Sequence, residues 1–176
     1  SIMSKKIAEG IDSLVLDIKT GNGAFMHTMD MATKLGNLLK KIGELNGVKV
    51  HVAITDMNQP LGNYSGIACE VQESIDALNG NGDSDLMDVV YKLGSKIMLQ
   101  AGVVNSSDQA IQIQKENIRS VSALKKFEEM VKNQSGQLDH GHNINNPSFS
   151  HNIKSKCDGY LKSYDTTAIG WALVEL

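Results

Sequence analysis

Two glycine-containing segments carry the residue types best suited to ligand chemistry, and each follows a short apolar run. Residues 20–26 read Thr-Gly-Asn-Gly-Ala-Phe-Met, and residues 56–66 contain Pro60 and two glycines. Glycine allows a ligand to approach the backbone closely, and Phe25 could supply an apolar wall. The alternative is a tight strand-to-helix turn with Phe25 in the core, because Gly-x-Gly without the full dinucleotide-binding pattern is a weak signal.

Other polar residues make weaker candidates. Lys5 and Lys6 are typical of a solvated helix face. Residues 139–142 read Asp-His-Gly-His, but a metal site needs further ligands placed by rigid structure, so we expect no metal there. Glu70 and Glu73 fall near one helix face, without a partner that would make them an acid/base pair.

Apolar periodicity predicts the elements that must position these residues. Helices are expected at residues 1–9, 28–45, 68–78, 85–100, 107–119 and 121–134, and strands at residues 13–19 and 48–55. The first strand is expected to be buried on both faces, because it is a short apolar run between glycines. After a polar loop at 135–152, residues 157–162 suggest the start of a hairpin. Residues 166–176 suggest a further element without a partner in the chain.

The order strand–helix–strand–helix predicts an α/β fold with a parallel strand pair. Ligands of open α/β sheets bind beyond the carboxyl ends of the strands, where both glycine-containing segments fall. Two strands are too few for a stable open sheet, and both ends of the chain read as cuts. We therefore expect the remaining strands to come from sequence outside these 176 residues.

Composition narrows the class of protein. The chain has 41% hydrophobic residues and a net charge of -3, which is ordinary for a globular protein with one core. Without a basic patch, and with a single tryptophan, we expect no nucleic-acid partner. Cys69 and Cys157 suit a reducing compartment, and no apolar run is long enough to cross a membrane. A cytoplasmic protein is expected.

Three motifs, in this order, resemble the pyrimidine-nucleoside phosphorylase family, which includes thymidine phosphorylases. They are SIMSKKIAEG at 1–10, LVLDIKTGNGAFM at 14–26 and TDMNQPLG at 55–62. The resemblance weakens after about residue 103 and returns at 158–160. It implies that residues 1–134 are part of the phosphorylase α/β domain, 135–152 a linker, and 153–176 the start of the C-terminal α+β domain.

The resemblance also implies an activity. Family members are pentosyltransferases that catalyse reversible phosphorolysis of thymidine, uridine or deoxyuridine to the free base and a pentose 1-phosphate. Phosphate is the co-substrate, no organic cofactor is expected, and the full-length parent is expected to be a homodimer.

The resemblance further assigns residues to two sites. Ser1 and Lys5 match the serine and lysine that hold the edge of the pyrimidine, and positions four apart share one helix face. Ile2 and Phe25 match residues that pack on the ring. A monovalent cation, potassium, would be held by the backbone carbonyls of Leu61 and Tyr64 and by the carboxylate of Glu73. At 66–71 the family's polar residue is lost, which alters local hydrogen bonding.

The family's Lys-x-Ser-Thr-Gly-Gly phosphate loop does not occur in the chain, and neither do the matching histidine and the arginine that contacts the base. No catalytic residue is therefore assigned, and the chain alone is expected to be inactive. Two alternatives stay open: a non-catalytic, truncated remnant that at most assembles with other chains, and an enzyme of the anthranilate phosphoribosyltransferase type, which shares the fold.

Overall fold

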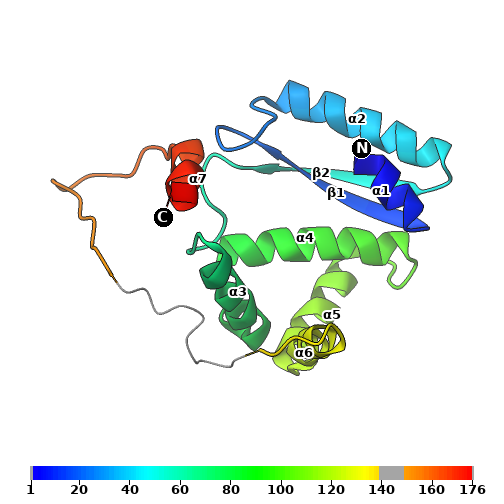
Figure 1. The fold of residues 1–176 in the computed structure, drawn as a ribbon. Coiled ribbons are helices and arrows are strands. Elements are labelled where there is room, and N and C mark those ends of the chain that lie inside the picture. Colours follow the sequence, from blue (N-terminus) through cyan, green and yellow to red (C-terminus); the bar gives the residue numbers. More distant parts are fainter. Residues whose placement is uncertain (1, 139–148, 176) are drawn as a thin grey trace.

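Two parallel strands form the centre of the fold, and helices lie on both of their faces (Figure 1). The computed structural model describes residues 2–138 and 149–175. Its elements, in chain order, are α1 (Ile2–Ala8), β1 (Ser13–Thr20), α2 (Met29–Leu45), β2 (Lys49–Asp56), α3 (Ile67–Asp76), the π-helical turn η1 (Ala77–Asn81), α4 (Ser84–Gln100), α5 (Ser107–Arg119), α6 (Ser122–Asn133) and α7 (Thr166–Glu175).

β1 and β2 pair in parallel, from Ser13 opposite Lys49 to Thr20 opposite Asp56. Helix α2 connects the strands and covers one face of the sheet, with α1 packed beside it, and α4 covers the other face (Figure 1). The α/β fold class and the parallel pair expected from the sequence are confirmed. Because the pairing is parallel, the loops that follow both strands emerge at the same end of the sheet.

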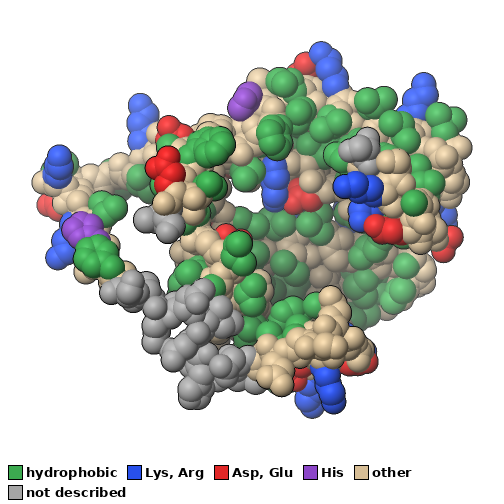
Figure 2. All heavy atoms as spheres, in the orientation of Figure 1, with side chains coloured by type: hydrophobic (Ala, Val, Ile, Leu, Met, Phe, Trp, Pro, Cys, Tyr) green, Lys and Arg blue, Asp and Glu red, His purple; other side chains and the backbone are tan. Residues whose placement is uncertain are grey.

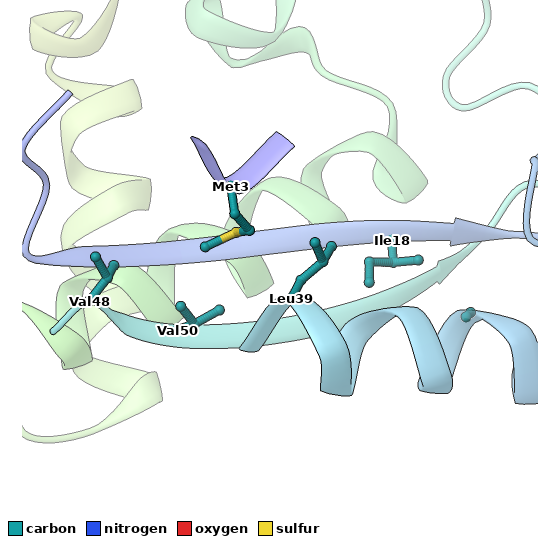
Figure 3. Close-up of a cluster of buried hydrophobic side chains, with 6 residues drawn as sticks. Met3, Ile18, Leu39, Val48 and Val50 are labelled. Atoms are coloured by element: carbon teal, nitrogen blue, oxygen red, sulfur yellow. The ribbon is translucent and has the colours of Figure 1, made fainter. Parts of the chain in front are cut away.

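The core lies between α1, α2 and the sheet (Figure 3). Its buried members are Met3, Ile18, Ala32, Leu39, Val48 and Val50. Val50 lies on β2 and Val48 directly precedes this strand, and one stripe of α2 supplies Ala32 and Leu39. The cap of α2 matches the predicted start, since the Thr28 hydroxyl accepts a hydrogen bond from the Met31 N–H at 3.3 Å.

β1 is less buried than the apolar run predicts. Ile18 is buried, but the other residues of β1 are only half-buried. The reason is positional: within the described residues β1 has one strand neighbour, β2, so its other edge carries no ladder. The expected cover on both faces is present, since α2 and α4 both contact β1, but most residues of the strand are only half-buried.

Two predicted helix ends shift slightly. The helix that we expected to end near residue 78 continues into η1, because the chain keeps helical torsions until Gly80 adopts a φ of 91°. The last long helix before the linker begins at Ser122 rather than residue 121, because Val121 has a left-handed φ of 61° and acts as the N-cap. A β-branched residue in that conformation is strained.

The C-terminal region differs most from the sequence-based expectations. Residues 157–162 contain no strand, so the predicted start of a hairpin is wrong. Tyr160 and Leu161 are exposed, and no strand among the described residues pairs with them. Residues 166–175 form α7, whose first residue, Thr166, is buried against the 20–26 loop. This element therefore has a partner in the chain, contrary to expectation.

Candidate functional site

The 20–26 loop begins where β1 ends and is held closed by its own backbone. The Gly21 N–H donates to the Met26 carbonyl at 3.2 Å, and the Thr20 hydroxyl donates to the same carbonyl at 2.9 Å. Gly21 has a φ of 128°, which favours glycine. The loop directs Phe25 outward, since its side chain is 95% exposed. The alternative that placed Phe25 in the core is therefore wrong.

A cavity of about 360 Å³ lies beside this loop, along β1. Ile2 from α1 and Phe25 from the loop both line it, together with Leu35 and Leu39 of α2. The structure thus brings together two of the four residues expected at the pyrimidine. Lys5 is exposed on α1 and is not among the residues that line the cavity, and Ser1 lies outside the described residues.

A polar cluster on the sheet was not singled out from the sequence. The Lys19 ammonium lies 2.7 Å from Asp17 Oδ2 and donates to Thr55 Oγ1 at 2.9 Å, and Thr55 Oγ1 donates to Asp17 Oδ1 at 2.6 Å. Asp17 and Lys19 also line the cavity. The sequence did contain a signal for this cluster. Two charged residues occupy alternate positions in an apolar run, and this spacing places both side chains on one face of the strand.

A second pocket, of about 340 Å³, contains all three residues expected at the cation. Leu61 and Tyr64 lie on the loop after β2, and Glu73 lies on α3. The Asn63 N–H donates to Glu73 Oε1 at 2.6 Å. Gly62, with a φ of 74°, passes so close that a Cβ there would lie 2.6 Å from both carboxylate oxygens. The loop therefore wraps around the Glu73 carboxylate.

The charge balance of this pocket suits a cation. Glu73 is 8% exposed, and no salt bridge to it occurs in the described part of the chain. A buried carboxylate without a counter-charge is costly. Carboxylate and carbonyl oxygens are the ligands that hard cations prefer. The residues present thus fit a monovalent cation, whose binding here stays a prediction.

Of the remaining candidates, Glu70 also lines the second pocket. Glu70 Oε1 accepts a hydrogen bond from the Gly66 N–H at 2.8 Å, so this carboxylate helps to begin α3. Residues 139–142, with their two histidines, lie outside the described residues. Elsewhere in the described ranges, no group of three or more His, Cys, Asp or Glu side chains could hold a metal ion. Similarly, no described helix is long and apolar enough to span a bilayer.

Comparison with known proteins places this geometry in a family. Residues 1–124 match the model of the glycosyl transferase family, a/b domain. The whole chain is 41% identical, over 179 aligned residues, to the pyrimidine-nucleoside phosphorylases of Staphylococcus aureus strains USA300, NCTC 8325 and bovine RF122. The chain spans 41% of the length of each of these relatives. The family match covers both strands, α1 and the two loops that line the pockets. The chain therefore belongs to the glycosyl transferase family that has this a/b domain.

Proposed function

We propose that this chain forms the pyrimidine-binding part of a pyrimidine-nucleoside phosphorylase, a pentosyltransferase that converts a pyrimidine nucleoside and phosphate to free base and pentose 1-phosphate. The observation that carries the proposal is the cavity at the end of β1, lined by Ile2 and Phe25. The relatives named above, 41% identical over the whole chain, support it.

In this proposal each residue has a separate task. Ile2 and Phe25 pack against the faces of the pyrimidine and exclude water from it. Lys5 donates to the carbonyl edge of the base, and Ser1 fixes its orientation. Negative charge builds on the base as the glycosidic bond breaks, so a donor that strengthens at that moment lowers the barrier.

The cation pocket has a supporting role. Leu61, Tyr64 and Glu73 would hold a monovalent cation, which supplies the positive charge that the buried carboxylate lacks. The Asn63 N–H already fixes one carboxylate oxygen beneath the loop that follows β2. Holding this loop also holds Met57, which lines both the cation pocket and the cavity beside Phe25.

Partners and setting follow from the same proposal. Phosphate would be the co-substrate, the complete enzyme would be a cytoplasmic homodimer, and no organic cofactor is required. Because the Lys-x-Ser-Thr-Gly-Gly motif is absent from the 176 residues, the chain alone would bind nucleoside without cleaving it. Positioning of the nucleophile accounts for several kcal/mol of a barrier of this kind.

Binding and cleavage can be measured separately. We expect thymidine and uridine to bind the purified chain in calorimetric titrations, adenosine not to bind, and no free base to appear with added phosphate. Phe25→Ala should weaken binding, whereas Phe149→Ala, which removes another exposed aromatic ring that stacks on His151, should not.

The outcomes separate the proposal from its alternatives. Equal binding of adenosine and uridine, or none of either, would contradict a pyrimidine site and favour a non-catalytic remnant. Binding of 5-phosphoribosyl 1-pyrophosphate in place of nucleosides would favour the anthranilate phosphoribosyltransferase type. Release of base at an ordinary enzymatic rate would contradict the expected inactivity of the isolated chain.

A further inference from the structure

Asn22 joins two parts of the chain that are far apart in sequence. Its side-chain Nδ2 donates to the Tyr164 carbonyl at 2.8 Å, and its Oδ1 accepts from the Thr166 N–H at 3.2 Å. Its backbone carbonyl accepts from the Thr167 hydroxyl at 2.6 Å. The 20–26 loop is thereby attached to the first residues of α7, more than 140 positions later.

The other side of the loop is attached to the segment after β2. The Asn22 N–H donates to Asn58 Oδ1 at 3.0 Å, and the Gly23 N–H donates to the Met57 carbonyl at 3.0 Å. Gly23 is packed on both sides, because a Cβ there would lie 2.6 Å from Thr166 Cγ2 and 2.9 Å from the Met57 oxygen. The loop is therefore held between two segments at Asn22 and Gly23, two to three positions before Phe25.

Phe25 lines two cavities. It lines the 360 Å³ cavity along β1 and also a cavity of about 490 Å³ whose far wall is α7. Thr166 and Trp171 of α7 line this second cavity. The docking of α7 therefore supplies one wall of a cavity that Phe25 also lines.

From these contacts we infer that Asn22 is a positioning residue for the nucleoside pocket. Asn22 holds the start of α7 against the loop. It thereby fixes the loop backbone that orients Phe25, and it keeps α7 in place as a wall of the 490 Å³ cavity. The inference rests on the proposed function only for the identity of the ligand. A merely structural role, in which Asn22 caps α7 and nothing more, predicts a loss of stability without a loss of nucleoside affinity.

Two variants and a control test the inference in the 176-residue chain. Asn22→Ala removes both side-chain hydrogen bonds. Asn22→Asp keeps the acceptor for the Thr166 N–H and loses the donor to the Tyr164 carbonyl. This milder variant still tests the inference if Asn22→Ala does not fold. Asn46→Ala is the matched control, because Asn46 Nδ2 donates at 2.8 Å to the Ile42 carbonyl at the far end of α2.

Three readouts accompany the melting temperature. They are hydrogen exchange of the Gly23 and Ala24 amides, acrylamide quenching of Trp171 fluorescence, and the uridine dissociation constant. Asn22→Ala should raise exchange and quenching and weaken uridine binding by about three- to tenfold, the range expected for lost hydrogen bonds. Asn22→Asp should fall between wild type and Asn22→Ala, and Asn46→Ala should change none of the three.

Each outcome decides the inference. Unchanged exchange and quenching in Asn22→Ala would overturn it, and so would a uridine affinity equal to that of Asn46→Ala. If Asn22→Ala lowered only the melting temperature, Asn22 would merely cap α7, and the inference would also be overturned. Absence of uridine binding in the wild-type chain would contradict the proposed function, while exchange and quenching would still show whether Asn22 fixes the loop.

Discussion

Lys5 and Ile2 share α1, yet only Ile2 lines the cavity beside Phe25. In a full-length phosphorylase that includes this segment, Lys5→Met keeps the stem of the side chain and removes its charge. Loss of a donor to the departing base should cost about 2–4 kcal/mol of transition-state stabilisation, roughly thirty- to a thousand-fold in kcat/KM. Steady-state kinetics at saturating phosphate measure this.

Lys6 provides the control for that experiment. It is the neighbouring lysine and donates to Glu9 at 3.0 Å, which is an exposed pair worth little. Lys6→Met should leave kcat/KM nearly unchanged. If Lys5→Met has an equally small effect, Lys5 is a solvated lysine and does not contact the base.

Glu73 gives a prediction about cations. If K⁺ binds the pocket, exchanging choline chloride for KCl at constant ionic strength should raise the melting temperature, since a ligand that binds only the folded state stabilises it. At about a hundred times its dissociation constant the gain would be about 2.7 kcal/mol, or several degrees for a chain of this size.

Glu73→Gln should abolish the difference between the two salts, because it removes the charge that attracts the cation. Glu44→Gln is the control, because it removes the same charge from an exposed carboxylate on α2 that pairs with Lys40 and does not line the pocket. A potassium effect that survives in Glu73→Gln would place the cation elsewhere.

His51, half-buried on β2, should make stability depend on pH. Burial lowers the pKa of His51, and the charges of Lys96 on α4 and Lys40 on α2 lower it further. The folded state therefore binds fewer protons than the unfolded state, so this contribution to stability is present at neutral pH. It should be lost as pH falls below about 6.5, the ordinary value.

Melting curves between pH 5 and pH 8 would measure this effect. His51→Gln removes the titrating group, so its melting temperature should fall less steeply with acidification than that of the wild-type chain. Identical slopes for the two proteins would show that His51 does not contribute.

Among the elements, α2 depends on glycine for its close approach to β2. A Cβ on Gly43 would collide with Val50 Cγ2 and lie 3.1 Å from Met3 Cε. Gly43→Ala should therefore destabilise the chain by about 1–3 kcal/mol, despite the better helix propensity of alanine, because the core would be overpacked. Denaturant unfolding would measure the change.

Gly170 in α7 is the matched control for Gly43. It is also a helical glycine, but a Cβ there meets no atom within 4 Å. Gly170→Ala should leave the free energy of unfolding unchanged or raise it by up to about 1 kcal/mol. A stabilising Gly43→Ala would mean that α2 can move away from the sheet at little cost.

For the molecule as a whole, exposed apolar surface and an open strand edge predict self-association. Phe25, Ile153, Trp171 and Val174 are all more than 60% exposed, and hydrophobic side chains recur over the face seen in Figure 2. The free edge of β1 adds unpaired backbone groups. We expect the folded chain to self-associate, so that its elution volume in size-exclusion chromatography decreases as the protein concentration is raised. An elution volume of a monomer that does not change with concentration would contradict this.

The sequence alone was sufficient for the family and for most of the helices and strands up to residue 134. The helix and strand periods, the Thr28 cap and the terminating Gly47 each depend on residues a few positions apart, so a linear reading detects them. The order of these elements predicted the parallel α/β pair. The motifs at 14–26 and 55–62 indicated the two loops that the structure places at one end of the sheet.

Only the tertiary structure decided how these parts meet. It showed that β1 has an open edge, that Asp17, Lys19 and Thr55 form one cluster, and that α7 returns to Asn22. Such contacts join positions 36 to 145 residues apart, and no local pattern encodes them. They depend on the packing of one element against another, which is established only when the chain has folded.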